Sequence, residues 1–138
     1  MRRLLVLAVL LCTFLLSGCA SDKRNEALTN TLNAYASVVR WGDFGSALQF
    51  IDPKVRDQHL PTQLEMARFD QFRVTGYDDG GGPAAGGENE VRQVVAISMV
   101  NNNTQAERTV IDRQTWRYDP QTNHWWLLTG LPDLTAEQ

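Results

Sequence analysis

Residues 106–118 read AERTVIDRQTWRY, and this stretch decides the fold. One of its two faces carries every second residue, namely Val110, Asp112, Gln114, Trp116 and Tyr118. This period of two predicts a long β-strand with one face covered. Residues 119–123 (DPQTN) are a turn signal, and residues 124–129 (HWWLLT) return the chain as a partner strand. The C-terminal part of the chain is therefore predicted to be an antiparallel hairpin.

Two further strands are predicted before this hairpin. Residues 91–100 (VRQVVAISMV) are more continuously apolar, which is typical of a central strand covered on both faces. Phe72, Val74 and Gly76 alternate with polar residues and predict an earlier, half-buried strand. Residues 79–87 lie between these two strands and are rich in glycine, so we expect a mobile hairpin loop there.

Helical spacing appears upstream of the strands. Within residues 26–41 the apolar side chains recur every three or four positions, at Leu28, Leu32, Tyr35 and Val39. Gly42 is typical of a helix end, and Asp43 of the N-cap of a following helix. Further short helices are expected over residues 44–51, after Pro53 and from Pro61 towards Phe69. Helices followed by antiparallel strands predict an α+β fold, with N-terminal helices packed on a sheet of about four strands.

Two stretches of the chain resemble the NTF2-like superfamily. They are residues 35–44 (YASVVRWGDF) with 47–53 (ALQFIDP), and the hairpin of residues 112–119 and 124–128. The resemblance covers roughly residues 26–132, and it implies a strongly curved sheet whose cone-shaped interior can hold a ligand or an active site. Because domains of this superfamily commonly pair through the exposed face of the sheet, it also implies a homodimer or a place in an envelope complex.

The N-terminal segment resembles the export signal of bacterial lipoproteins. The chain begins MRR, continues with an apolar run over residues 4–16, and then reads LSGC at residues 16–19, the order of a lipobox. The apolar run is shorter than the roughly 20 residues that span a bilayer. The resemblance implies that residues 1–18 are a cleaved lipoprotein signal peptide and that Cys19 becomes the acylated N-terminus. An ordinary secretory signal is the alternative.

The residues after Cys19 bear on the location of the protein. Ala20 occupies the position where an Asp favours retention in the inner membrane, so resemblance to sorted Gram-negative lipoproteins implies the outer membrane, facing the periplasm. Asp22 lies close by, and the outer leaflet of the inner membrane remains the alternative. Residues 19–25 are interpreted as an acylated tether, and the acyl chains on Cys19 as the membrane contact. At the other end, residues 133–138 are expected to be a flexible tail.

Composition narrows the function classes. Removal of residues 1–18 from the 138 would leave 120 residues, which suits one domain. Thirteen Lys and Arg, less Arg2 and Arg3, against sixteen Asp and Glu leave a net charge of −5, which argues against nucleic acid as a partner. Cys12 lies in the signal segment and Cys19 would carry lipid, so no pair remains for a disulfide.

No cofactor or metal site is predicted. The acidic residues that flank the glycine-rich loop are Asp78, Asp79, Glu88 and Glu90. They lack the alternating oxygen ligands of a calcium loop, and the loop lacks the Lys and Ser or Thr of a phosphate-binding loop. We therefore expect a solvent-exposed hairpin rather than an ion site.

The four tryptophans are Trp41, Trp116, Trp125 and Trp126. Trp116, Trp125 and Trp126 are candidate binding residues, because tryptophans on a concave sheet can line a pocket for a flat apolar ligand. The alternative is core packing across the hairpin, which we favour. Trp125 and Trp126 are adjacent on one strand, so they should point to opposite faces.

No catalytic set is favoured; if the chain is an enzyme, Asp112 is its candidate base, with Tyr35 as the partner. A carboxylate in an apolar cleft can act as a general base, and enzymes of the NTF2-like superfamily use an aspartate in this way. The alternative places Asp112 on a solvated strand face, paired with Arg92, Arg108 or Arg113. Neither His59 nor His124 is well placed to assist.

Two functions remain open. The favoured one is a membrane-anchored lipoprotein that acts as a non-catalytic module and binds a partner protein or a small apolar ligand. The alternative is an NTF2-like enzyme of the isomerase or dehydratase type that uses Asp112 as its base.

Overall fold

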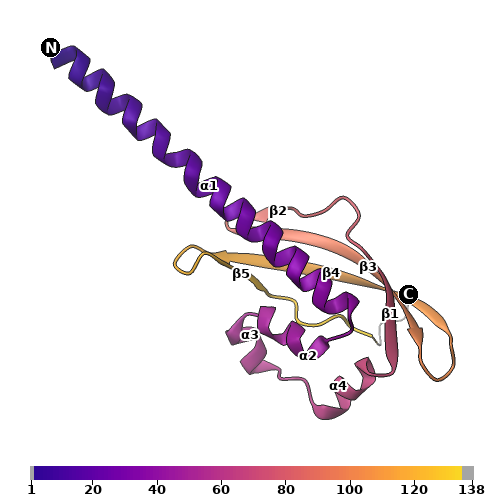
Figure 1. The fold of residues 1–138 in the computed structure, drawn as a ribbon. Helices are drawn as coiled ribbons and strands as arrows, with labels where there is room; N and C mark the ends of the chain where they lie inside the picture. Colours follow the sequence, from indigo (N-terminus) through magenta and orange to yellow (C-terminus); the bar gives the residue numbers. More distant parts are fainter. Residues whose placement is uncertain (1, 135–138) are drawn as a thin grey trace.

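The computed structural model describes the backbone of residues 2–134 and the side chains of residues 19–134. It shows an α+β fold with helices packed on a curled antiparallel sheet, which confirms the predicted class (Figure 1). The elements in chain order are α1 (Arg2–Arg40), α2 (Phe44–Ala47), a 3-10 turn (Leu48–Phe50), α3 (Pro53–Gln58), α4 (Gln63–Phe69), β1 (Phe72–Asp78), β2 (Ala84–Gly87), β3 (Glu90–Asn101), β4 (Glu107–Asp119) and β5 (His124–Leu127). The side chains of residues 1–18, which the sequence predicts to be a signal peptide, and residues 135–138 of the expected tail lie outside the described residues.

The predicted end of the first helix is confirmed at Gly42. This residue has a φ of +72°, a left-handed conformation that costs glycine little and other residues more. The next helix starts as expected, because the Oδ1 of Asp43 accepts a hydrogen bond from the backbone N–H of Ser46 over 3.0 Å. The chain therefore turns sharply at the end of α1, and α2 packs back against it.

Side-chain caps also position the two following helices. The Oδ1 of Asp52 accepts from the backbone N–H of Lys54 at the start of α3, and its Oδ2 accepts from the guanidinium of Arg117 on β4. Thr62 and Glu65 form a capping box at the start of α4. Asp52 is buried, so this contact ties the helical half of the chain to the sheet.

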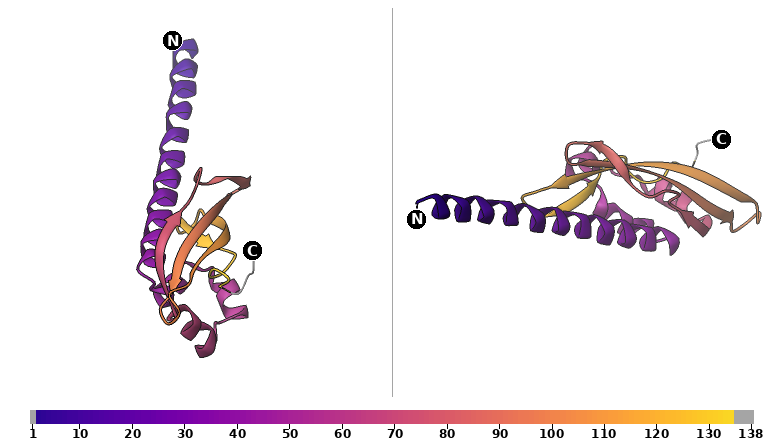
Figure 2. Two further views of the ribbon diagram at one scale, coloured as in Figure 1. Left: turned by 90° about the vertical axis from the view of Figure 1, so that its right-hand side faces the viewer. Right: turned by 90° about the horizontal axis from the view of Figure 1, so that it is seen from above.

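The sheet has the strand order β1-β3-β4-β5, with every neighbouring pair antiparallel. The long central pair β3–β4 runs in register from Glu90 opposite Arg117 to Val100 opposite Glu107. A register shift interrupts β1 between Val74 and Gly76. Two further views show the sheet curling, with α1 running along its inner side (Figure 2).

The glycine-rich segment differs from the expected mobile loop. Its last four residues form β2, which pairs with the start of β3 and extends the sheet beyond the end of β1. Gly86 lies so close to Arg92 that an added Cβ would stand 3.0 Å from the Cγ of that arginine. Alanine and glycine residues can pair through backbone hydrogen bonds without packing side chains on either face of the sheet. The composition of the segment alone therefore did not predict this strand.

The alternation predicted for residues 106–118 is confirmed. Val110, Asp112, Gln114 and Trp116 are all buried on the inner face of β4. The prediction that residues 91–100 are covered on both faces is wrong, because Val94 is 56% exposed on the outer face of β3. β3 is central within the sheet, but α1 and the shorter helices cover one side of it only.

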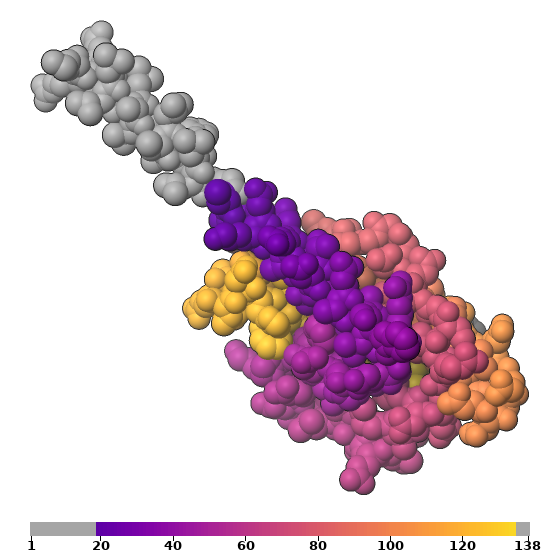
Figure 3. Space-filling view, in the orientation of Figure 1, coloured from indigo at the N-terminus to yellow at the C-terminus, as the bar shows by residue number. Residues whose placement is uncertain are grey.

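Residues 19–25, the expected tether, are helical and form part of α1. The carbonyl of Arg24 accepts a hydrogen bond from the Nε1 of Trp125 over 3.2 Å. The Arg24 guanidinium also lies over the rings of Tyr118 and Trp125, at 5.1 and 5.3 Å from their centroids. The β4–β5 hairpin thus holds this part of α1 against the sheet, as the space-filling view shows (Figure 3). Within the described residues, no helix has both the length and the hydropathy needed to cross a bilayer.

Candidate functional site

A cluster of hydrogen-bonded polar side chains lies on the inner face of the sheet, in the centre of the core. Gln114 connects it: its Nε2 donates to Asp112 Oδ2 over 2.7 Å and to the hydroxyl of Tyr77 over 3.3 Å. Its Oε1 accepts from Trp116 Nε1 over 3.1 Å and from Gln93 Nε2 over 3.4 Å. Alternation along β3 and β4 places these side chains inward, and the register sets Gln93 directly opposite Gln114.

Tyr35 of α1 reaches the same cluster from the helical side. Its ring packs edge-on against Trp116, with the centroids 5.3 Å apart. Burial, and then the charge of Asp112, raises the pKa of the Tyr35 phenol well above 10. The Tyr35 hydroxyl and the Oε1 of Gln93 are buried and have no hydrogen-bond partner among the described residues. Such atoms are costly in a core, because each gives up its hydrogen bonds to water without gaining a partner.

Asp112 lies in this cluster and not on a solvated face. Burial raises its pKa from 3.8 to about 6, although the hydrogen bond from Gln114 partly offsets the effect. The expectation that it pairs with Arg92, Arg108 or Arg113 is therefore wrong. Residues at even positions of β4 face inward, whereas Arg113 is exposed on the opposite side.

One groove opens next to the cluster, and we call it the α1 groove. It has a volume of about 590 Å³ and lies between α1 and the edge of the sheet. Its lining residues are Leu32, Asn33, Ala36, Ser37, Arg40, Trp41, Tyr77, Asp79 and Gln93. Tyr77 and Gln93 belong to both the groove and the cluster, so they connect the surface with Asp112, which does not line the groove.

Arg40 has a defined position beside the α1 groove. Its Nη2 donates to the backbone carbonyl of Tyr77 over 3.2 Å, and its guanidinium lies 5.6 Å from the centre of the Tyr77 ring. Burial raises the pKa of the Tyr77 phenol to about 12, so this hydroxyl is a neutral donor and acceptor at neutral pH. The groove therefore combines a fixed cation, a phenol and amide groups in one place.

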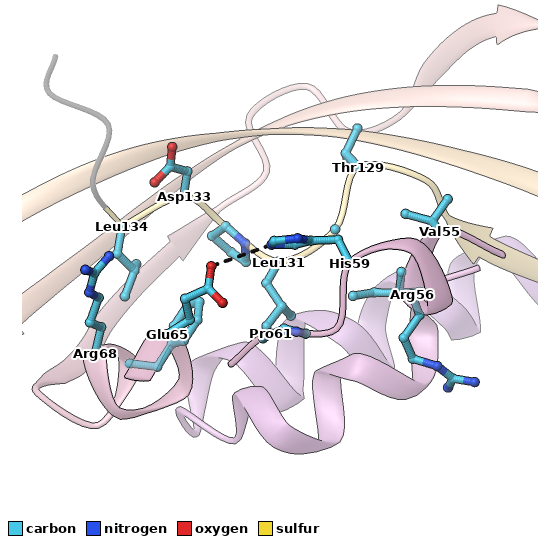
Figure 4. Close-up of a pocket in the computed structure, with 14 residues that line it drawn as sticks. Val55, Arg56, His59, Pro61, Glu65, Arg68, Thr129, Leu131, Asp133 and Leu134 are labelled. Atoms are coloured by element: carbon cyan, nitrogen blue, oxygen red, sulfur yellow. Dashed lines mark ion pairs between the residues drawn. The ribbon is translucent and has the colours of Figure 1, made fainter. Parts of the chain in front are cut away.

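A second groove lies on another side of the domain, between the helices α3 and α4 and residues 129–134 (Figure 4). It has a volume of about 500 Å³ and a mostly apolar floor, to which Leu131 contributes. His59 and Glu65 face one another at its rim, with 3.5 Å between His59 Nε2 and Glu65 Oε1. Leu134 is buried here, so the packed core extends two residues past Pro132. The His59 side chain is largely exposed, and its ion-pair partner is the carboxylate of Glu65.

The candidate tryptophans have different positions. Trp116 and Trp125 are fully buried core residues, which fits the packing interpretation that the sequence favoured. Trp126 points to the other face as expected, and its ring lies 4.1 Å from that of His124. Trp41 is 86% exposed at the end of α1. Sequence reasoning placed no weight on Trp41 as a binding residue, and it missed Tyr77, Gln93 and Arg40 entirely.

One signal could have revealed Gln93. It interrupts an otherwise apolar strand at an inward position, and a buried amide needs partners. Arg40 carried no comparable signal, because a basic residue in the last turn of a helix is common for reasons of the helix dipole alone. Among the described residues, no group of His, Cys, Asp or Glu is arranged to hold a metal ion.

Comparisons with known proteins add little to this description of the site. No protein-family model matches the chain, and no curated protein sequence matches it. Among solved structures, a SEC-C motif containing protein from Rhodopseudomonas palustris, determined in solution, is 18% identical. That similarity covers 72% of this chain and 70% of the other, with a TM-score of 0.43.

Proposed function

We propose that this protein is an envelope lipoprotein, anchored by acyl chains on Cys19, whose NTF2-like domain binds a small ring-containing polar ligand in the α1 groove. One observation carries the binding proposal. The α1 groove combines the guanidinium of Arg40, held beside Tyr77, with the exposed polar side chains of Asn33 and Ser37 and the apolar surface of Leu32 and Ala36.

The NTF2-like assignment is supported by the arrangement of the layers. A long helix lies along the inner side of a curled antiparallel sheet, and the shorter helices pack beside it. The polar cluster occupies the position between helix and sheet where the resemblance to this superfamily implies a ligand or active site. The sheet order and the α+β class are compatible with this assignment, which rests on the sequence resemblance.

The proposed anchor is supported by the sequence of the leader and by the exposure of Cys19. The helical segment between Cys19 and Arg24 is short, so an acylated Cys19 would hold the domain close to the bilayer. Ala20 favours the outer membrane, with the inner membrane as the alternative. Several acyl chains on one residue would make the attachment effectively permanent, because each buried methylene contributes about 0.8 kcal/mol.

The first test concerns the anchor. Cells grown with radiolabelled palmitate are expected to incorporate label into this polypeptide, and the Cys19→Ala variant is expected to carry none. Fractionation should recover the parent protein with outer membranes and the variant away from them. An unlabelled parent protein, or one recovered from the cytosol, would contradict the anchor proposal.

The ligand proposal follows from the chemistry of the groove wall. Ser37 offers an exposed hydroxyl, Asn33 an exposed amide, and Arg40 a guanidinium held by the carbonyl of Tyr77. Leu32 and Ala36 supply apolar surface on the helix side. A ligand with a ring and hydroxyl or amide substituents would satisfy both kinds of surface.

The second test blocks the groove without touching the core. Benzamide, 4-hydroxybenzamide and phenol serve as probes, added to the mature acylated protein (residues 19–138) in detergent and followed by backbone amide shifts. We expect shifts at residues of the α1 groove in the parent protein. Ser37→Trp should abolish them, because Ser37 is an exposed groove residue, whereas Ala34→Trp, an exposed helix position outside the groove, should not. If the Ser37→Trp variant still shows these shifts, the α1 groove is not the binding site.

A second candidate is the enzyme that the sequence analysis left open. Asp112 has a pKa raised to about 6, and Tyr35 and Tyr77 lie near it, which suits a general base with phenolic hydrogen-bond donors. However, Asp112 is separated from the α1 groove by Gln93 and Tyr77. We therefore favour binding over catalysis, since a base must reach the proton that it removes.

A further inference from the structure

Trp41 is the most exposed large hydrophobic residue of the described chain, with 86% of its surface open to solvent. It follows the last turn of α1 and directly precedes Gly42, where the chain turns. An indole in this position presents a broad apolar face to solvent. Single exposed aromatic residues are common on protein surfaces, so a role for Trp41 depends on what surrounds it.

Trp41 stands between two grooves. It lines the α1 groove together with Arg40, and the same two residues line a further groove, which we call the Phe72 groove. The Phe72 groove has a volume of about 500 Å³, and its other lining residues are Gly42, Phe69, Asp70, Phe72, Arg73, Val74 and Asn102. Arg40 and Trp41 thus form a ridge with a hollow on each side. A ligand longer than one ring could lie across this ridge and enter both grooves.

The polar groups around the ridge are mixed in kind and balanced in charge. Arg40 and Arg73 are offset by Asp70 and Asp79, so neither groove has a strong net charge. An anionic ligand would need an excess of Lys and Arg, and a cationic one an excess of carboxylates. Hydroxyl, amide, carboxylate and guanidinium groups together can both donate to and accept from a ligand rich in hydroxyls. The chemistry favours a neutral ligand.

The shape of Trp41 adds a second requirement. A broad, exposed aromatic face binds a flat ring or the C–H face of a sugar ring, because such partners cover apolar surface without needing a pocket. A neutral chain of sugar rings satisfies both requirements, since its ring faces are apolar and its edges carry hydroxyls. A protein segment would also fit the apolar face, and failure of the sugar probes to bind would favour it over a sugar chain.

We propose that a neutral linear oligosaccharide binds across the ridge, with one sugar ring stacked on Trp41 and its neighbours in the α1 groove and the Phe72 groove. This inference rests on the proposed binding function and names its ligand class. Arg40 is held beside Tyr77 by the hydrogen bond from its Nη2 to the Tyr77 carbonyl, so this side of the ridge has a fixed position before the ligand arrives.

The test uses the mature acylated protein (residues 19–138) in detergent, with chitotetraose and cellotetraose as probes and their dimers and monomers for comparison. Binding is measured by calorimetry and by tryptophan fluorescence. We expect affinity to rise with chain length, because only a chain reaches both grooves. Trp41→Ala should weaken tetramer binding by about tenfold or more, and Trp41→Phe should retain part of it while removing most of the fluorescence change.

Trp126→Phe is the matched control, because it alters a tryptophan outside both grooves and should leave binding and its fluorescence change intact. Failure of both tetramers to bind, or equal binding by Trp41→Ala, would overturn the proposal. Tighter binding of tetragalacturonate than of the neutral tetramers would overturn the neutral assignment. If the tetramers fail while the benzamide probes still bind at the α1 groove, the oligosaccharide inference falls and the proposed binding function stands.

Discussion

Replacing Trp116 with alanine is expected to lower the free energy of unfolding by about 3–5 kcal/mol. Trp116 is fully buried, and its ring packs edge-on against Tyr35 at a centroid distance of 5.3 Å. Its Nε1 also donates to the Oε1 of Gln114 over 3.1 Å. The substitution removes this donor and leaves a cavity between α1 and the sheet. Because small domains are stable by only about 5–15 kcal/mol, the loss takes a large share of the total.

Urea unfolding followed by circular dichroism measures this effect. Trp41→Ala is the matched control, because it removes the same side chain from an exposed position and should change the free energy of unfolding by less than about 0.5 kcal/mol. The control also establishes that the variant used for sugar binding folds. Equal midpoints for the Trp116 and Trp41 variants would show that Trp116 does not support the core as described.

Asp112→Asn is expected to stabilise the protein at neutral pH by about 3 kcal/mol. The pKa of Asp112 is about 6 in the folded state, against 3.8 for the ordinary carboxyl. A difference of about two pH units corresponds to about 3 kcal/mol. Burial of the charged form is the physical cause. Asparagine is neutral at every pH and nearly the same size, and its Oδ1 can still accept the hydrogen bond from Gln114.

The sign of the pH dependence follows from the same values. Between about pH 4 and pH 6 the folded state holds more protons than the unfolded state, so the stability of the parent protein should fall as the pH rises. The decrease should level off above about pH 7, where Asp112 is ionised in both states. Unfolding curves at several pH values should show this slope in the parent protein and a smaller slope in Asp112→Asn.

Asp57→Asn provides the control for a simple change of net charge. Asp57 is exposed, so this variant should keep the slope of the parent protein. The contrary result would be a stability that rises from pH 4 to pH 7 by the same amount in the parent protein and in Asp112→Asn. It would show that the carboxyl of Asp112 is not buried as described. Such a result would also remove the main support for Asp112 as a general base.

Much of the local structure could be predicted from the residues themselves. The end of α1 at Gly42, the cap at Asp43 and the turn after Asp52 depend on single residues with special backbone or hydrogen-bonding properties. The strand of residues 106–118 has a clear period of two, and its inward residues are the expected ones. In each case the signal and the structure that it predicts lie within a few positions of each other.

The predictions failed where burial depends on distant parts of the chain. Val94 looks like a core residue by composition, but nothing among the described residues covers the outer face of β3. Asp112 looks like a surface carboxylate near three arginines, but the strand alternation turns it inward and α1 closes over it. The β2 strand formed because β3 offers it a free edge, which short Ala and Gly residues can use.

The sequence by itself determined the α+β class, the helix ends and the alternation of the long strand, because these follow from backbone preferences and from the period of two. Only the tertiary structure decided that Asp112, Gln114 and Gln93 meet beneath Tyr35, and that Arg40 and Trp41 stand between two grooves. The physical reason is that burial and pairing are properties of contacts. The contacts that bury Asp112 come from α1 and β3, which lie far from it in the chain.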